Sequence, residues 1–169
     1  MKFIRFLIYC LLLSGFLGCS SSPDRNMLEN KFVKAKSLFA QEQYVEALEI
    51  YQTTIKESPE SAKAYAGWGL CLDHLTQHQE AKQALAKAIS LDPTQAEFFL
   101  ILGIIDFHNS DRKAAFDNFN QARALNSYLP EVYFNLGVCL FHEGQYQQAS
   151  EMYQKFFAIH PGRWTAHVL

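Results

Sequence analysis

From residue 28 onward, apolar residues recur at the spacing of amphipathic helices, in pairs of segments that short polar breaks separate. In the last pair, one helical period runs through Tyr133 and Leu136, and a second runs through Tyr146 and Tyr153. The polar residues 143–145 lie between the two segments. This pattern predicts an all-α chain built from helical hairpins.

The hairpins repeat with a fixed 34-residue period, which several independent columns of residues share. The columns are Ala47, Ala81, Ala115 and Ala149; Ala35, Gly69, Gly103 and Gly137; Tyr51, Leu85, Phe119 and Tyr153; and Pro59, Pro93, Ser127 and Pro161. Small residues on both helices of a hairpin would let the two backbones approach closely. The large residues would then fill the space beside them.

These columns resemble the tetratricopeptide repeat (TPR) family, whose units are helix-turn-helix hairpins. The resemblance covers residues 28–163 and implies a right-handed solenoid of four units. The expected units are residues 28–61, 62–95, 96–129 and 130–163, followed by the truncated segment 164–169.

Residues with a preference for helix ends lie where the period places those ends. Gly144 suits a left-handed position after a helix, and Pro130 suits the first turn of one. Thr94 followed by Glu97 predicts a capping box at the start of the third unit. The prolines that follow the second helices would end them.

Three departures from the columns need an explanation. Lys31 and Lys34 replace large apolar residues in the first unit, which is consistent with a solvated edge that no earlier helix covers. Phe156 replaces a small residue in the last unit, which suggests that the following helix is missing or differently placed. Asp106 falls in a column of leucines, so we expect it to pair with a nearby arginine, or the helix to be rotated.

Residues 1–27 predict export and a lipid anchor. Residues 1–18 combine basic residues with an apolar run that is too short to span a bilayer, as in a signal peptide. The small residue before Cys19 and the Ser/Pro segment after it resemble the lipobox of bacterial lipoproteins, so residues 19–27 are interpreted as a lipidated cysteine and a tether. We expect an exported, membrane-anchored lipoprotein, at the outer membrane facing the periplasm in a Gram-negative host. The alternatives are an uncleaved apolar anchor and ordinary cleavage nearby.

Composition excludes several other classes of protein. The chain has 169 residues, of which 49% are hydrophobic and 19% charged, so it can bury a core. A net charge of -2 argues against nucleic-acid binding. No catalytic or nucleotide-binding motif is present, so we expect neither enzymatic activity nor a cofactor. Cys71 and Cys139 are two repeats apart, too far for a disulfide, and are interpreted as free buried thiols.

The resemblance implies a concave groove lined by the first helix of each unit. The residues at the implied lining positions are Phe32, Lys36, Phe39, Ala66, Leu70, Asp73, His74, Leu100, Ile104, Phe107, His108, Phe134, Val138, Phe141 and His142. This mainly apolar set favours an apolar helix or peptide as the ligand. The alternative is that these rings are the core of a tightly wound, short solenoid. The helix expected over residues 98–107 is apolar nearly all round, so a side of it would be exposed or covered by a partner.

The three histidines at the groove edge share the repeat period, but they would lie too far apart to bind one metal ion together. We therefore predict no metal site. The sequence predicts an envelope scaffold that binds another envelope protein, with type IV pilus or secretion assembly as the narrower hypothesis. The alternatives are an adaptor for cell-wall hydrolases or outer-membrane assembly machinery, and a subunit that self-associates through residues 164–169. Those residues could equally fold back over the last hairpin.

Overall fold

The structure is a computed structural model that describes residues 25–159, which form eight α-helices and no strand. The helices are α2 (Arg25–Ala40), α3 (Tyr44–Glu57), α4 (Ala62–His74), α5 (His78–Leu91), α6 (Ala96–His108), α7 (Arg112–Leu125), α8 (Pro130–His142) and α9 (Tyr146–Ile159). They pair as four helical hairpins: α2 with α3, α4 with α5, α6 with α7, and α8 with α9. The predicted all-α solenoid is confirmed.

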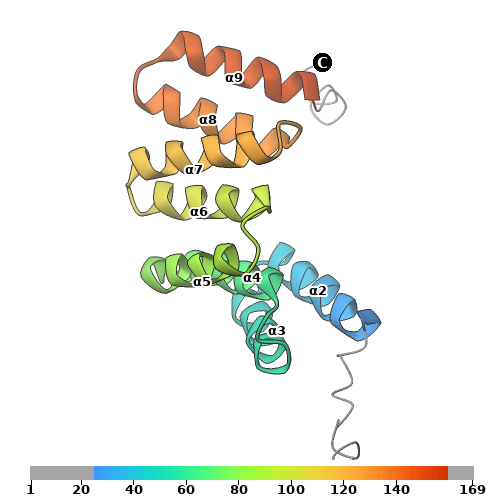
Figure 1. The fold of residues 1–169 in the computed structure, drawn as a ribbon. Helices are drawn as coiled ribbons and strands as arrows, with labels where there is room; N and C mark the ends of the chain where they lie inside the picture. The colour runs from blue at the N-terminus through green and yellow to red at the C-terminus, as the bar shows by residue number, and fades with distance from the viewer. Residues whose placement is uncertain (1–24, 160–169) are drawn as a thin grey trace, which may run out of the picture.

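Each hairpin packs on the next, so the chain winds into an elongated stack (Figure 1). The second helix of one unit contacts the first helix of the following unit, as α3 does with α4 and α5 with α6. The first helices also contact one another from α4 to α6 and from α6 to α8. Because these contacts join neighbouring units, the first helices form one continuous side of the stack.

The N-terminal end of the described chain differs from the predicted boundary. Helix α2 begins at Arg25, so residues 25–27 of the predicted tether belong to the first helix. The signal segment 1–18, Cys19 and the C-terminal residues 164–169 lie outside the described residues. Between residues 25 and 159, no helix is both long and apolar enough to cross a membrane.

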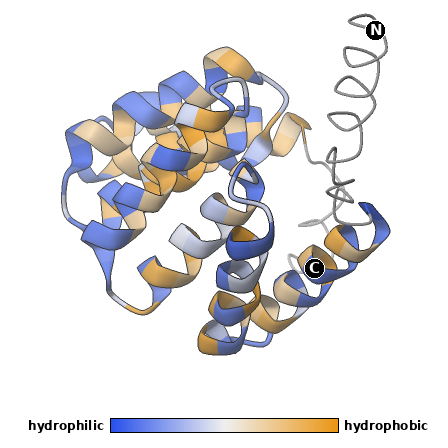
Figure 2. Ribbon diagram, turned by 60° about the horizontal axis from the view of Figure 1, so that its bottom comes forward, coloured by the Kyte–Doolittle hydropathy of each residue, from blue (hydrophilic) through white to orange (hydrophobic). Residues whose placement is uncertain are grey.

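The hydrophobic core consists of three clusters, each at a junction between two units. Figure 2 shows hydrophobic residues gathered where the helices face one another and hydrophilic residues along the turns and outer sides. Helix α6 is packed against α4, α5, α7 and α8. Its apolar residues are all buried or half-buried, so the side that was expected to be exposed or covered by a partner is instead covered by these four helices.

The glycines of one column, Gly69, Gly103 and Gly137, leave space for a side chain of the second helix rather than for its backbone. A Cβ added at Gly103 would lie 2.5 Å from the Phe119 ring, and one at Gly137 would lie 2.5 Å from the Tyr153 ring. At Gly69 the nearest atom is a Leu85 methyl carbon. The small residue on the first helix therefore accommodates the large residue that the repeat period places opposite it on the second helix.

All four hairpin turns end their first helix in the same way. In the last unit, Gly144 has φ +73° and its N–H donates to the Phe141 carbonyl at 3.0 Å, while the Gln145 N–H donates to the Leu140 carbonyl at 2.9 Å. This is a Schellman motif, and it confirms the predicted role of Gly144. The other three turns place residues with side chains at a similar positive φ: Glu42, Thr76 and Ser110.

Of the two predictions about where helices start, one is confirmed and one is wrong. Pro130 is the first residue of α8, as predicted. The capping box at Thr94 and Glu97 is wrong, because α6 has Gln95 as its N-cap and no side chain caps it. The Thr94 hydroxyl instead donates to Asp92 at 2.6 Å, in the turn after α5. That turn holds the pKa of the Asp92 carboxyl below its usual value, chiefly through the Thr94 and Gln95 side-chain hydrogen bonds.

Candidate functional site

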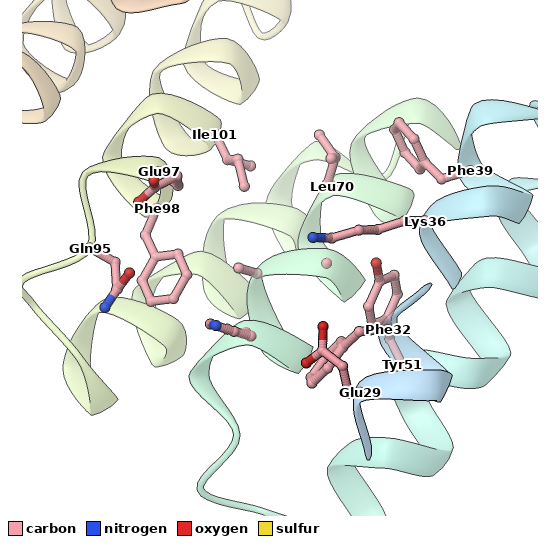
Figure 3. Close-up of a pocket in the computed structure, with 13 residues that line it drawn as sticks. Glu29, Phe32, Lys36, Phe39, Tyr51, Leu70, Gln95, Glu97, Phe98 and Ile101 are labelled. Carbon is pink, nitrogen blue, oxygen red and sulfur yellow. The ribbon is translucent and has the colours of Figure 1, made fainter. Parts of the chain in front are cut away.

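A groove with a volume of about 520 Å³ lies between the first helices of the first three units, α2, α4 and α6 (Figure 3). Its apolar lining comes from Phe32, Phe39, Tyr51, Ala66, Gly67, Leu70, Phe98 and Ile101. Its polar lining comes from Glu29, Lys36, Lys63, Gln95 and Glu97. The site is therefore an apolar floor with charges of both signs around it.

Tyr51 is the lining residue that comes from a second helix, α3. It reaches the groove because Gly67 has no side chain: a Cβ there would lie 2.3 Å from the Tyr51 ring. The tyrosine is 5% exposed. Burial, followed by the nearby Cys71, raises the pKa of Tyr51 to about 12, so its hydroxyl keeps its proton at neutral pH. In Figure 3 that hydroxyl points toward the Lys36 side chain, across the groove floor.

Three of the four charged residues lie at equivalent places on the first helices of successive units. Glu29, Lys63 and Glu97 share the 34-residue period, and all three are exposed. Lys36 is exposed on α2, about two helical turns after Glu29. Two acids and two bases around one groove leave no net charge at its mouth. Recognition would then depend on apolar contact with the floor, and the charges would orient a ligand.

Some of the predicted groove residues line this site, and the others lie elsewhere in the structure. Phe32, Lys36, Phe39, Ala66 and Leu70 line the groove. The predicted residues of α6 and α8 do not line it. Leu100 is buried in the core cluster between units three and four, and Ile104 and Phe107 pack against that cluster half-buried. Because α6 turns a different face to α4, its apolar groove residues are Phe98 and Ile101, which the sequence analysis did not select.

Asp73 was predicted to line the groove and is instead 2% exposed. Its carboxylate oxygens bind two histidine rings: Oδ1 lies 2.8 Å from His78 Nδ1, and Oδ2 lies 2.6 Å from His108 Nδ1. His78 belongs to the same unit and His108 to the next unit. A buried carboxylate needs such partners, and here they connect α4, α5 and α6.

The three periodic histidines all contact the preceding unit, which makes them junction residues. His74 stacks on Tyr44 with 4.5 Å between ring centroids and meets the edge of Phe39 at 4.9 Å. His108 binds Asp73, and His142 lies 5.5 Å from the Phe107 ring. Between residues 25 and 159 no group of three metal-binding side chains comes together.

The predicted groove residues of α8 lie at the far end of the stack. Phe134 and Phe141 are 46% and 55% exposed, and Val138 between them is half-buried. Phe134 contacts Tyr153 and Phe156 on α9. Phe134 and Phe141 therefore belong to an aromatic surface of the fourth unit that is separate from the groove.

Asp106 is buried at 2% exposure and forms a structural pair, but its partner is not an arginine. The Lys82 ammonium from α5 lies 2.5 Å from Asp106 Oδ1, and the Asn118 amide from α7 donates to Oδ2 at 2.7 Å. The prediction missed Lys82 because lysine and aspartate lie in different units. Together with Asp73, this pair gives the junction of units two and three a polar core.

Cys71 and Cys139 are buried free thiols, as predicted. Burial raises the pKa of the Cys71 thiol to about 12. Burial likewise raises the pKa of the Cys139 thiol to about 11, with a smaller contribution from Glu143. Neither thiol is available as a nucleophile at neutral pH.

Two models of the tetratricopeptide repeat family match this chain, one over residues 38–104 and the other over residues 130–163. Among curated proteins, the Hsp70-Hsp90 organizing protein of Triticum aestivum is 27% identical over 84 residues. That stretch is 50% of this chain and 14% of the wheat protein, so the chain spans a small part of this relative's length.

Solved structures give the same result. MamA superposes with a TM-score of 0.63 at 27% identity, over 76% of this chain and 75% of MamA. YrrB, described as a TPR protein with an unusual peptide-binding site, has a TM-score of 0.58 at 26% identity, over 76% of this chain and 66% of YrrB. PilF of Pseudomonas aeruginosa has a TM-score of 0.72 at 17% identity, over 79% and 61% of the two chains, which is a likeness of fold alone. The four hairpins, their shared period and these matches show that the chain belongs to the tetratricopeptide repeat family, whose members act as protein-protein interaction scaffolds.

Proposed function

We propose that this protein is a non-enzymatic scaffold that binds an apolar helix or peptide of another envelope protein in the groove between α2, α4 and α6. The observation that supports the proposal is the groove itself, about 520 Å³ with an apolar floor and a charged rim. This volume lies within the range of roughly 300–1,000 Å³ that is typical of ligand pockets. The likeness to YrrB, a TPR protein with a peptide-binding site, supports a peptide as the ligand.

The envelope location is the second part of the proposal. A signal peptide over residues 1–18 would export the chain, and lipids on Cys19 would hold it at a membrane, with the folded units beside the bilayer. A role in type IV pilus or secretion assembly is the narrower part of the proposal. An adaptor for cell-wall hydrolases or for outer-membrane assembly machinery would use the same groove and the same anchor.

Site-specific photo-crosslinking tests the groove. A benzoylphenylalanine in place of Leu70 on the groove floor should give a discrete adduct with one envelope protein in living cells. The matched control places the same residue at Val33, which is 59% exposed on α2 and does not line the groove. The double variant Leu70→Asp/Ile101→Asp should abolish the adduct from a crosslinker at Phe39. Equal adducts from positions 70 and 33 would refute the groove as the binding site.

The anchor is tested separately. Labelled palmitate should be incorporated into the wild-type chain and not into Cys19→Ala, and the variant should leave the membrane fraction. If Cys19→Ala still incorporates label or stays in the membrane, the proposed lipid anchor is wrong, and the groove proposal is unaffected.

A further inference from the structure

The three junctions between units are built in the same way. Helix α4 inserts Ala64 and Cys71 into the core cluster of the first unit, which contains Phe32, Ala47 and Tyr51. Ala64 and Cys71 are both 0% exposed and lie at positions i and i+7 of the helix. This spacing is close to two helical turns, so both side chains lie on the face of α4 that meets the preceding unit.

The next two junctions use the same positions. Phe98 and Ile105 of α6 lie in the cluster of the second unit, and Val132 and Cys139 of α8 lie in the cluster of the third. All four are at most 4% exposed. Three residues after the second position comes the histidine that contacts the preceding unit. A docking helix in this protein therefore has apolar residues at i and i+7 and a histidine ring at i+10.

The fourth unit presents the surface that receives such a helix, and in the structure this surface is exposed. Phe134 is 46% exposed, whereas the equivalent residues Phe32, Ala66 and Leu100 are at most 9% exposed because the next unit covers them. Phe157, on the adjoining helix α9, is 50% exposed. The surface is continuous with the row of junctions and has their composition.

An aromatic pair on this surface has the geometry of one that already holds a histidine. In the first unit, Phe39 and Tyr44 lie 5.1 Å apart at 67°, and both contact the His74 ring. In the fourth unit, Phe141 and Tyr146 lie 5.3 Å apart at 63°. These two rings are 55% and 64% exposed. The pair is preformed, and the ring that would complete it is supplied by none of residues 25–159.

We propose that this end of the stack, formed by Phe134, Phe141, Tyr146 and Phe157, is a second interaction surface. Its occupant is a helix of a partner protein that packs as α4, α6 and α8 do, with apolar residues at i and i+7 and an imidazole or aromatic ring at i+10. The ring enters the Phe141–Tyr146 pair, where its edge and face meet two aromatic rings. Helix-in-groove packing of this kind is a common mode of peptide recognition.

The same three positions argue against a second copy of this chain as the occupant. In α2, the helix that a head-to-tail copy would present, these positions hold Asn30, Ser37 and Ala40. All three are exposed, two are polar, and none carries a ring. The pattern therefore favours a helix from another protein over a second copy. Within residues 160–169, Ala166 falls at the first of the three positions. The proposal is independent of the groove, which lies on other helices.

Fluorescence anisotropy with a helical peptide tests the surface on the full-length protein. The probe is a fluorescein-labelled peptide with the α4 sequence, residues 62–74, held helical by a lactam between Lys63 and a glutamate introduced by Gly67→Glu. This bridge leaves Ala64, Cys71 and His74 free. A matched control peptide carries Ala64→Asp and Cys71→Asp. We expect saturable binding of the probe and none of the control peptide.

Variants of the protein locate the binding. Phe141→Ala/Tyr146→Ala should weaken the binding of the probe about tenfold or more, because the variant removes both aromatic rings that the ring of the probe would contact. Tyr128→Ala, at a ring that is 81% exposed elsewhere, and Leu70→Asp in the groove should leave the affinity unchanged. Circular dichroism should show the same helicity for all four proteins.

Four results would overturn the proposal. The probe and the control peptide could bind equally, or the Phe141→Ala/Tyr146→Ala variant could bind like wild type. Sedimentation could show dimers that the probe dissociates, which would make a second copy the occupant. Finally, Ala166→Asp could raise the affinity for the probe about tenfold or more, and tenfold corresponds to about 1.4 kcal/mol. That result would make residues 160–169 the occupant of the surface.

Discussion

Gly103→Ala tests whether the small-residue column determines the packing within a unit. The added Cβ would lie 2.5 Å and 2.6 Å from two ring carbons of Phe119, which is 1% exposed. The ring would have to move by roughly 1 Å to restore ordinary carbon–carbon contact. Overpacking of this kind in a dense core costs about 1–3 kcal/mol, while alanine in place of glycine in a helix gains about 1 kcal/mol. Because the fully buried ring has little room to move, the cost lies in the upper part of that range, and we expect a net loss of about 1–2 kcal/mol.

Gly137→Ala is the matched control, because the geometry is the same and the freedom of the ring differs. Its added Cβ would also lie 2.5 Å from a ring, but Tyr153 is half-buried and can turn toward solvent. We expect no loss of stability, or a small gain from helix propensity. Urea and thermal unfolding, followed by circular dichroism, measure both variants. The melting temperature of Gly103→Ala should fall by about 2–8 °C.

The two variants also give the result that would refute the reasoning. If Gly103→Ala is as stable as wild type, the Phe119 ring is not held where a side chain would meet it. If both variants lose the same stability, the freedom of the ring is irrelevant and the backbone of the second helix sets the limit. A second substitution, Phe119→Leu, should recover part of the loss in the Gly103→Ala background and destabilise the wild type.

Three further predictions concern single sites. Thr76→Gly should raise the free energy of unfolding by about 1 kcal/mol, measured by urea unfolding, because a β-branched residue at φ +62° is strained there; a decrease would contradict this. Lys82→Ala should lower the free energy of unfolding by about 1–3 kcal/mol, because the substitution leaves the buried Asp106 carboxylate without its ammonium partner. Lys87→Ala, at an exposed lysine of the same helix, should leave that free energy unchanged. Burial raises the pKa of Cys71 to about 12, so the unfolded thiol ionises at lower pH than the folded one. Its contribution to stability is therefore full below about pH 8.5 and is lost as pH rises toward about 12, and Cys71 should resist iodoacetamide at about pH 8 until the chain unfolds.

The sequence by itself determined the architecture. A fixed period carried by small and large residues in regular columns specifies hairpins that can pack only on their neighbours, and each column has the same physical role in every unit. Gly144 and Pro130 marked their helix ends because their backbone preferences are local. The left-handed positions of the other three turns could not be predicted in this way. Glu42, Thr76 and Ser110 have no local preference for that conformation and adopt it because the helices on both sides require it.

Only the tertiary structure decided where the site lies and which residues face it. The period placed His74, His108 and His142 in one column, but their partners differ: Tyr44 and Phe39 for the first, Asp73 for the second and Phe107 for the third. The packing of each unit on the preceding one brings these partners to each ring, and it also buries Asp73. Tyr51 enters the groove through the space left at Gly67 in another unit. A column fixes the position of a residue along its own helix, whereas its exposure depends on the angle at which the next unit packs, and that angle is set by side chains from several units at once.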